Sequence, residues 1–316
     1  MVYNVALHLG ALLCLPFWLA ARLLRGRYRG QFKERMGILP HEILARFPSG
    51  EGAVWIHAAS AGETAAAAPL VRRLRDLLPR RPFLFTVTSR YGKEMAGKRL
   101  NGVVDAIAFS PLDLPFFCRR FLRRIRPSLY VMVETDLWPN LVTLAKRRGA
   151  RVAVASGQAG PRTFPRPFWR SVFRSVDLLL MQSETDAKHI VARGALPERV
   201  HVGGNLKFDG AGRMDRAALP AWRAELKLPP KARVLVAGST LLEDEGPVLD
   251  AVRDLRAEGL DLVAIVAPRR QERVAPLLDA CSARGLPAAR RTGGGAGAVL
   301  VLDTMGELQR AYEVAD

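Results

Sequence analysis

Residues 53–78 read AVWIHAASAGETAAAAPLVRRLRDLL, and this stretch decides the fold class. Its opening, AVWIHAA, is an apolar run too short for a helix, so it predicts a buried strand over residues 53–59. The small residues that follow allow a tight turn, and TAAAAPLVRRLRDLL then reads as a helix. A buried strand followed at once by a helix is typical of a parallel sheet covered by helices.

The same alternation continues along the chain, because further apolar runs of strand length lie between helical stretches. These predicted strands are 82–89, 103–109, 129–134, 150–156 and 177–183. Together with the first strand they are enough for one doubly wound α/β domain.

A polar, proline-containing stretch at about 210–231 carries no strand signal and marks a domain boundary. A second series follows, with predicted strands at 234–239, 262–268 and 298–303. We therefore predict an α/β protein with two Rossmann-like, doubly wound domains that face a cleft at the carboxyl ends of their strands. The expected divisions are 1–36 for an N-terminal anchor and its basic flank, 37–210 for the first domain and 211–316 for the second.

Residues 5–24 read VALHLGALLCLPFWLAARLL and are almost wholly apolar. A helix of this length covers about 30 Å, one hydrocarbon core, so the segment fits either a membrane span or a helix lying in the interface. A basic cluster lies at its end and beyond: Arg22, Arg25, Arg27, Arg29, Lys33 and Arg35. Such a cluster sits at anionic headgroups on the cytoplasmic side, and no Lys or Arg precedes the apolar run as in a removable signal. We expect the chain to stay anchored.

The charge of the chain is unevenly distributed. The formal net charge is +18, residues 1–200 contain 32 Lys/Arg against 14 Asp/Glu, and residues 201–316 contain 16 of each. Arginine, which supplies 40 of the 48 basic residues, matches phosphate oxygens two at a time and favours an anionic, phosphorylated partner for the first half. A genomic bias toward arginine explains the Arg:Lys ratio equally well, but it does not explain the asymmetry.

Polar residues at the ends of predicted strands are the candidates for chemistry. Glu63 stands in the first turn of a helix and fits either a base for an incoming hydroxyl or an ordinary N-terminal helix glutamate. Glu134 closes the predicted strand 129–134 and fits either orientation of a catalytic partner or stabilisation of charge, or a cap of the following helix. Lys207 follows a Gly-Asn turn and fits either a contact with a carboxylate or phosphate, or a solvated surface lysine.

A further set lies at strand ends of the second domain, where such groups fit either a nucleotide phosphate site or ordinary turns. Its members are Gly238, Ser239, Thr240, Pro268, Arg269, Met305, Gly306 and Glu307. None of these segments matches a P-loop or a dinucleotide fingerprint. The three cysteines, Cys14, Cys118 and Cys281, are far apart, and no paired metal-ligand spacing or Ser-His-Asp order is visible. We expect neither a metal nor a cofactor.

Taken in order, several segments resemble the Kdo transferases of lipopolysaccharide biosynthesis, which transfer 3-deoxy-D-manno-octulosonic acid (Kdo). The segments are FKERMG (32–37), IHAASAGE (56–63), PLDLP (111–115), VETDLWPN (133–140), QSETDA (182–187), GNLKFD (204–209), AGST (237–240), APR (267–269) and DTMGEL (303–308). The resemblance implies the two-domain glycosyltransferase-B architecture. It also implies inverting, metal-independent transfer of Kdo from CMP-Kdo to a lipid A precursor, lipid IVA, at the cytoplasmic face of the inner membrane. The implied partners are both substrates and membrane lipids, with no nucleic acid.

By matching position, the resemblance also assigns roles to residues. Glu63 matches the proton acceptor, while Glu134 and Lys207 match stabilisers of a transition state in which negative charge grows on the leaving phosphate. Pro268, Arg269, Met305, Gly306 and Glu307 match positions that bind the CMP of the donor, and Gly238, Ser239 and Thr240 are additional candidates.

Two features depart from the family pattern. Residues 155–162 read ASGQAGPR in place of a segment of the N-A-R-x-S-E-R type, which bears on acceptor contacts. The chain ends at Asp316, before the glycine-rich turn and N-x-L-E motif that complete the CMP site in the family, so we expect a truncated second domain.

Two other classes of protein are alternatives. A sugar-nucleotide epimerase shares the architecture, but its substrates are soluble and do not call for a membrane segment. A membrane-tethered nucleic-acid-binding protein fits the net charge, but it predicts aromatic residues clustered among the basic ones, and aromatics make up only 7% of the chain.

Overall fold

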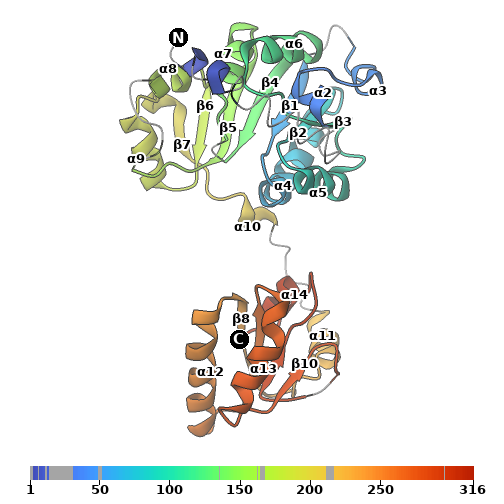
Figure 1. Ribbon diagram of the computed structural model, residues 1–316, viewed down its shortest axis with the longest axis vertical. Coiled ribbons are helices and arrows are strands. Elements are labelled where there is room, and N and C mark those ends of the chain that lie inside the picture. The colour runs from blue at the N-terminus through green and yellow to red at the C-terminus, as the bar shows by residue number, and fades with distance from the viewer. Residues whose placement is uncertain are drawn as a thin grey trace. The chain divides into compact units, whose positions relative to one another are not determined.

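The computed structural model describes residues 3–5, 7–10, 13, 31–48, 52–134, 136–161, 163, 168–210, 217–294 and 296–316. The chain divides into two compact units, Met1–Gly210 and Ala211–Asp316, each with its own parallel sheet (Figure 1). Most of the predicted membrane segment at 5–24 and the arginines up to Arg29 lie outside the described residues. Within the described ranges, no helix combines the length and the apolar character needed to cross a membrane.

The described part of the first unit contains a seven-stranded sheet in the order β3-β2-β1-β4-β5-β6-β7. Its strands are β1 (Ala53–His57), β2 (Phe83–Val87), β3 (Ala106–Phe109), β4 (Pro127–Val133), β5 (Arg151–Gly157), β6 (Leu178–Met181) and β7 (Val200–Val202). The first six match the predicted runs, but β7 was not predicted, because it has three residues and none of them is fully buried. The strand order reverses between β1 and β4, and open α/β sheets bind ligands outside the strand ends at such a switch point.

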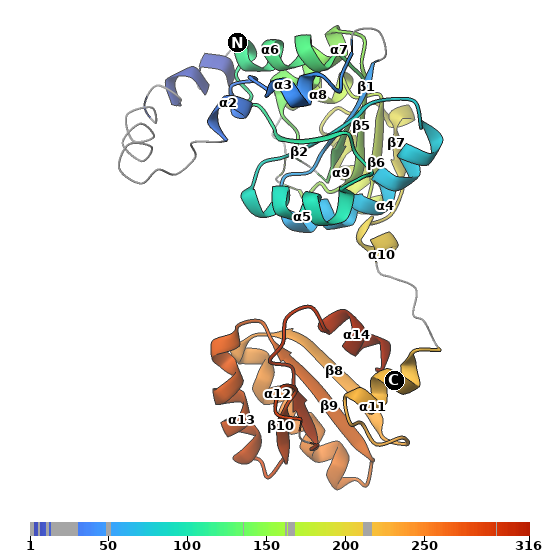
Figure 2. The same cartoon turned by 90° about the vertical axis from the view of Figure 1, so that its right-hand side faces the viewer.

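Helices cover both faces of this sheet (Figure 2). One face packs against α4 (Ala61–Leu77) and α5 (Arg90–Leu100), and the other against α6 (Pro115–Ile125), α7 (Pro139–Arg147), α8 (Phe168–Arg174) and α9 (Glu184–Ala192). Short elements are α2 (Phe32–Arg35), α3 (His41–Leu44), the 3₁₀ turn η1 (Pro197–Arg199) and α10 (Lys207–Gly210). Trp55 and Tyr130, both fully buried, stack with ring centroids 3.8 Å apart in the core beneath α6 and α7.

At the amino-terminal edge of the sheet the same contact occurs twice. Asp105, just before β3, donates its N–H to the carbonyl of the first residue of β2 (3.0 Å), and its carboxylate accepts that residue's N–H (2.6 Å) and pairs with Arg75 (2.5 Å). Asp177, just before β6, repeats the arrangement with the second residue of β5 (2.7 and 2.9 Å) and Lys146 (2.5 Å). Each of these two staple aspartates therefore joins two strands and the end of a helix.

The described part of the second unit contains a four-stranded parallel sheet in the order β10-β11-β9-β8. Its strands are β8 (Arg233–Thr240), β9 (Leu262–Pro268), β10 (Ala288–Arg290) and β11 (Val299–Val301). The unpredicted strand is β10, which has three residues and no buried position. One face packs against α12 (Leu242–Ala257) and α13 (Val274–Ser282), which follows the 3₁₀ turn η2 (Gln271–Arg273), and the other against α11 (Leu219–Glu225) and α14 (Leu308–Glu313).

Candidate active site

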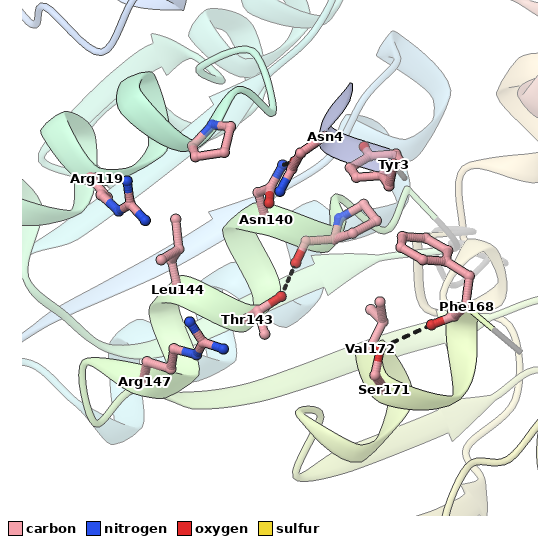
Figure 3. Close-up of a pocket in the computed structure, with 12 residues that line it drawn as sticks. Tyr3, Asn4, Arg119, Asn140, Thr143, Leu144, Arg147, Phe168, Ser171 and Val172 are labelled. Carbon is pink, nitrogen blue, oxygen red and sulfur yellow. Dashed lines mark hydrogen bonds between the residues drawn. The ribbon is translucent and has the colours of Figure 1, made fainter. Parts of the chain in front are cut away.

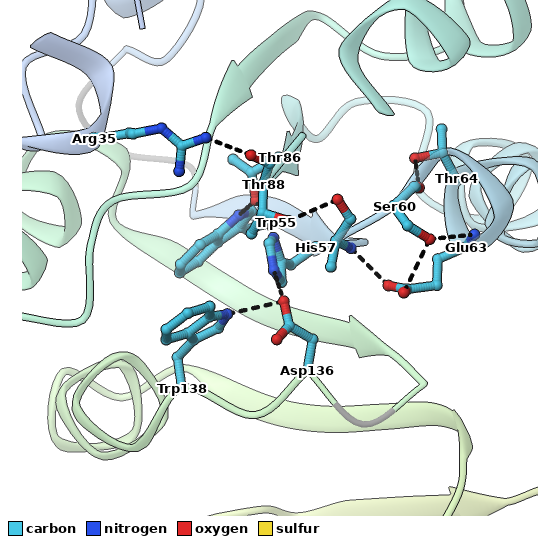
Figure 4. Close-up of polar contacts among 11 residues, drawn as sticks. Arg35, Trp55, His57, Ser60, Glu63, Thr64, Thr86, Thr88, Asp136 and Trp138 are labelled. Atoms are coloured by element: carbon cyan, nitrogen blue, oxygen red, sulfur yellow. Dashed lines mark hydrogen bonds and ion pairs between the residues drawn. The ribbon is translucent and has the colours of Figure 1, made fainter. Parts of the chain in front are cut away.

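Glu63 lies in the first turn of α4, directly after β1 (Figure 4). The Ser60 Oγ accepts the N–H of Glu63 (3.2 Å), and the Glu63 carboxylate reaches back to accept the Ala59 N–H (2.6 Å) and the Ser60 hydroxyl (3.0 Å). This arrangement resembles a capping box, except that Glu63 accepts the N–H one residue before the N-cap Ser60, so the structural role that the sequence left open for Glu63 is present. It also fixes the direction of the carboxylate. A carboxylate can accept about four hydrogen bonds, so about two positions remain free for another donor.

The loop that leads to Glu63 is tied to the segment before the sheet. The Thr88 hydroxyl donates to the Ala59 carbonyl (2.7 Å), and the Arg35 guanidinium donates to the Thr88 carbonyl. Glu34, beside Arg35, is buried and accepts hydrogen bonds from Lys93 Nζ (3.0 Å) and from the N–H of the last residue of β3 (2.6 Å). The FKERMG segment is therefore fastened to the strand ends near Glu63.

Glu134 immediately follows β4 and has a positive φ of 59°. Its Oε1 forms an ion pair with Lys207 Nζ (2.8 Å), and the two side chains are 18% and 54% exposed. Glu134 Oε1 is buried and accepts no hydrogen bond of good geometry from the described residues. Its polar contact among them is the ion pair with Lys207. A non-glycine residue with positive φ is strained, and such positions concentrate at functional sites.

The alternative role of Glu134 as a cap of the next helix is wrong. Two N–H groups at the start of α7, those of Asn140 and Leu141, donate to the Asp113 carboxylate at 3.0 and 2.9 Å. The cap of α7 therefore comes from the loop before α6, and Glu134 is left to face Lys207.

A chain of polar side chains holds Lys207 in place. The Lys207 N–H donates to Asn205 Oδ1 (2.9 Å), Asn205 Nδ2 donates to Gln182 Oε1 (3.1 Å), and Gln182 Nε2 donates to Ser156 Oγ (3.1 Å). Ser156, near the end of β5, also has a positive φ of 59°. Since α10 packs against α4, the structure brings Lys207 and Glu134 to the helix that carries Glu63 in its first turn.

The structure adds residues for which the sequence analysis proposed no role. His57, fully buried at the end of β1, contacts Thr86 Oγ1 through Nδ1 (2.9 Å) and Asp136 Oδ2 through Nε2 (2.9 Å). Trp55 Nε1 donates to Thr86 Oγ1 (2.8 Å), and Trp138 Nε1 donates to Asp136 Oδ2 (3.0 Å) (Figure 4). These five residues form a chain that crosses from β1 to the loop after β4, and we call it the buried polar chain because Trp55, Thr86 and His57 are fully buried, while Asp136 and Trp138 are partly exposed. The signal in the sequence was a single histidine within an otherwise apolar strand.

The candidates in the second unit lie at the carboxyl ends of the adjoining strands β8, β9 and β11. The Arg269 N–H donates to the Thr240 carbonyl (3.0 Å), which joins two of these ends. The Arg269 side chain is exposed, and Met305 is 87% exposed. Ser239 has a positive φ of 57°, so backbone strain also marks this edge, whereas the positive φ of Gly306 (90°) is ordinary for glycine.

Two candidates of the second unit already have close neighbours. A Cβ added to Gly238 would lie 2.1 Å from the Tyr312 hydroxyl oxygen, so α14 occupies the space beside this glycine. Glu307 accepts a hydrogen bond from Arg291 (3.1 Å) and another from the Thr304 hydroxyl. Burial alone would lower the pKa of Arg291, but the hydrogen bonds and charges of Glu307 and Glu225 raise it above its usual value.

A cavity of about 210 Å³ lies between the N-terminal segment and helices α6, α7 and α8 (Figure 3). Tyr3 borders it, donates to Asp113 Oδ2 (2.8 Å) and packs against Phe168, with ring centroids 5.0 Å apart. Burial raises the pKa of Asp113 despite the backbone N–H groups that it accepts. None of the candidate catalytic or nucleotide-binding residues is among the described residues that line this cavity.

The fold defines a class of protein. UDP-GlcNAc 2-epimerase from Neisseria meningitidis, solved bound to UDP-GlcNAc, is similar with a TM-score of 0.58 and 13% identity over 83% of this chain and 74% of its own. A glycosyltransferase from Rickettsia africae is similar with a TM-score of 0.55 and 8% identity over 84% of this chain and 72% of its own. At such identities the likeness concerns the fold alone, which is the glycosyltransferase-B type predicted from the sequence.

The sequence comparisons show the family. The family model of 3-deoxy-D-manno-octulosonic-acid transferase (kdotransferase) matches residues 30–210. The 3-deoxy-D-manno-octulosonic acid transferases of Bordetella pertussis and Chlamydophila psittaci are 31% and 30% identical, over 100% of this chain and over 76% and 73% of their own lengths. A bifunctional glycosyltransferase/methyltransferase of Fusobacterium nucleatum is 28% identical over 92% of this chain, which spans only 47% of that relative. The chain belongs to the Kdo transferase family of glycosyltransferases.

Proposed function

We propose that this protein transfers Kdo from CMP-Kdo to a lipid A precursor, lipid IVA, by inverting substitution and without a metal held by the protein. The observation that carries the proposal is the placement of Glu63, Glu134 and Lys207 at the carboxyl edge of the first sheet, where the strand order reverses. Family membership supports Kdo as the transferred sugar. The donor and the acceptor are the proposed part.

In the proposed reaction, Glu63 removes the proton from a hydroxyl group of the acceptor. The oxygen attacks the anomeric carbon of Kdo while the bond from that carbon to the CMP phosphate breaks, and CMP leaves with the bonding electrons. Lys207 stabilises the negative charge that develops on the departing phosphate, and the ion pair with Glu134 orients its ammonium group. Arg269, exposed at the end of β9, binds the cytidylate of the donor.

The surface of α6 supports a location at the cytoplasmic face of the inner membrane. Its buried side packs into the core, and its outer side carries the α6 basic face, which we define as Phe116, Arg119, Arg120, Arg123, Arg124 and Arg126. Phe116 is 61% exposed, and none of the five arginines forms an ion pair with a described residue. Unpaired arginines next to an exposed aromatic ring fit anionic lipid headgroups.

The N-terminal segment supports the same location. Tyr3 and Asn4 hold it against α7 and α8, through Asp113, Phe168 and Asn140. Val5 and Leu9, which follow in the apolar run, are 53% and 57% exposed. The apolar run therefore begins on the same face of the sheet as the α6 basic face.

The activity is tested by incubating the protein with CMP-Kdo and lipid IVA and analysing the lipid products by mass spectrometry. We expect one molecule of CMP released for each Kdo added to the lipid. Release of CMP without a lipid-linked Kdo would contradict the proposed transfer. The epimerase alternative predicts isomerisation of UDP-GlcNAc instead, which NMR of the sugar nucleotide detects.

The location is tested by sedimentation with phosphatidylcholine vesicles that contain or lack phosphatidylglycerol. The double substitution Arg123→Glu and Arg124→Glu is expected to weaken binding to the anionic vesicles at least about tenfold, because each basic residue near the surface contributes about 1 kcal/mol. Arg72→Glu with Arg73→Glu on α4 makes the same change of charge on the opposite face of the sheet and serves as the control. Equal losses in both variants would assign the effect to net charge and contradict a role for the α6 basic face.

A further inference from the structure

One carboxylate at the switch point of the first sheet has an oxygen that is open to a ligand. Asp136 Oδ2 accepts two N–H groups, from His57 Nε2 (2.9 Å) and from Trp138 Nε1 (3.0 Å). Asp136 Oδ1 has no hydrogen-bond partner within the described structure, and the side chain is 27% exposed. Two donors of the protein therefore fix Asp136 Oδ2, whereas Oδ1 remains available to accept a hydrogen bond from a ligand.

The direction of the hydrogen bonds in the buried polar chain follows from its two tryptophans, because an indole N–H can only donate. Thr86 Oγ1 accepts from Trp55 and is fully buried, and the acceptor that the described residues offer to its own hydrogen is His57 Nδ1. The other ring nitrogen, Nε2, then carries the hydrogen of the neutral imidazole and donates it to Asp136. Each link thus has one donor and one acceptor, and the chain ends at the partly exposed carboxylate.

The position of Asp136 in the sheet indicates a role in ligand binding and not only a structural role. The bond between His57 and Asp136 joins the end of β1 to the loop after β4, where the strand order reverses and open sheets bind ligands. The segments that follow the same two strands carry the proposed proton acceptor Glu63, in the first turn of α4, and Glu134, the partner of Lys207. Asp105 also has one oxygen without a partner in the described chain, but it lies at the opposite edge of the sheet, before β3.

We infer that Asp136 binds a hydroxyl group of the sugar acceptor through Oδ1, and that His57 and Trp138 are positioning residues that orient this carboxylate. The inference rests on the proposed function for the nature of the acceptor. A sugar presents several hydroxyl groups, and the reactive one has to be aligned with Glu63. A second, fixed hydrogen-bond acceptor aligns the ring, since a hydroxyl bound to a carboxylate makes a strong, charge-assisted bond.

The substitution Asp136→Asn tests this contact without removing the support around it. The amide oxygen can still accept from His57 and Trp138, while an NH₂ group takes the place of Oδ1 and cannot accept a hydroxyl. We expect at least about tenfold weaker binding of a phosphorylated glucosamine disaccharide, measured by calorimetry, and an equal rise in the KM for lipid IVA. Binding of CMP-Kdo is expected to stay unchanged.

The matched control is Asp105→Asn, which makes the same chemical change on a carboxylate of similar exposure at the other edge of the sheet. It is expected to leave disaccharide binding unchanged. Equal binding by the parent and Asp136→Asn would overturn the inference, and so would a parent protein that does not bind the disaccharide or an equal loss in Asp105→Asn.

The positioning residues are tested by Trp138→Phe and His57→Gln. Phenylalanine keeps an aromatic ring but removes the donor to Asp136, whereas glutamine keeps an N–H near the place of Nε2. We expect Trp138→Phe to raise the KM for the acceptor several-fold with little change in kcat, and His57→Gln to retain more acceptor affinity than His57→Leu. Nitrogen NMR of histidine-labelled protein should show the hydrogen of His57 on Nε2, and a hydrogen on Nδ1 would contradict the direction of the chain.

Failure of this inference can be distinguished from failure of the proposed function. If the parent forms Kdo-lipid and Asp136→Asn has the same KM for the acceptor, the function stands and the role of Asp136 is wrong. If the disaccharide binds in an Asp136-dependent way but no Kdo is transferred, the acceptor site stands and the proposed reaction is wrong.

Discussion

The two edges of the seven-stranded sheet both hold carboxylates next to cations, but they use them differently. At the amino-terminal edge, the staple aspartates Asp105 and Asp177 join regular strands through backbone N–H groups. At the carboxyl edge, Glu134 has a strained backbone and its partner Lys207 is 54% exposed. An ion pair alone therefore does not mark a functional charge. Backbone strain and a place at the switch point distinguish the second edge.

Among substitutions at the two edges, the largest effect on the rate of Kdo transfer is expected from Glu63→Gln, at the carboxyl edge. The amide preserves the contact at the start of α4, since it still accepts the Ala59 N–H, but it is not a base. We expect kcat for Kdo transfer to fall about 10³- to 10⁴-fold, in the upper part of the range for general bases, with unchanged affinity for CMP-Kdo. Ser89→Ala removes the cap of α5 and should cost about 1 kcal/mol of stability without a loss of rate. Parent-like rates in Glu63→Gln would leave Glu63 only its helix-capping role.

A smaller loss is expected from Lys207→Met, which breaks the ion pair with Glu134 and removes the charge that we propose stabilises the leaving phosphate. We expect kcat to fall about 10²-fold, as for other single groups that stabilise transition-state charge. The free energy of unfolding should also fall by about 1–3 kcal/mol, because the buried Glu134 Oε1 loses its polar contact. Lys188→Met on α9 is the control for loss of an exposed lysine. A loss of stability with an unchanged rate would mean that this ion pair is structural, like the ion pairs of the staple aspartates.

The corresponding edge of the second unit is tested by Arg269→Ala. We expect the dissociation constant for CMP-Kdo, measured by calorimetry, to rise about 10- to 100-fold, since hydrogen bonds to charged groups contribute about 1.5–3 kcal/mol. The neighbouring Arg270→Ala, also exposed, removes the same charge one residue further from the strand end. Equal losses in both variants would mean that general surface charge, and not a contact at the end of β9, binds the nucleotide.

The smallest effect is expected from Asp177→Asn at the amino-terminal edge. Burial raises the pKa of Asp177, but the hydrogen bonds from Lys146 and Val152 and the nearby positive charges outweigh burial and hold it below its usual value. A folded-state pKa below the unfolded value favours the folded protein only while the carboxylate is ionised. The substitution should therefore cost about 1 kcal/mol in urea unfolding at pH 7. The difference should shrink as the pH falls below about 5, and its persistence at pH 3 would contradict this account.

The sequence predicted the long elements well, because continuous apolar runs such as LYVMV mark strands buried on both faces. It missed β7 and β10, since three-residue strands at the sheet edges contain too few buried positions to form a pattern. It also placed Glu63, Glu134 and Lys207 at strand ends, but it could not pair Glu134 with Lys207. That contact depends on the order of the strands and on the strained backbone of Glu134, which no local pattern encodes.

The buried polar chain was beyond prediction for the same reason. His57 and Asp136 are 79 positions apart and meet only because β1 and β4 are neighbours in the sheet. An isolated histidine in an apolar strand shows that some polar partner must exist, since buried polar groups are normally hydrogen-bonded. The partner itself has to come from the fold.

The tie between the FKERMG segment and the loop before α4 has a consequence for geometry at a bilayer. Only three hydrogen bonds, from Arg35 to Thr88, from Thr88 to Ala59 and from Ala59 to Glu63, separate the polypeptide after the apolar run from the proposed base. At the proposed location, these hydrogen bonds set the distance between Glu63 and the lipid headgroups, because they connect Glu63 to the part of the chain that follows the membrane segment. A hydroxyl that protrudes to that height can react without being drawn out of the membrane.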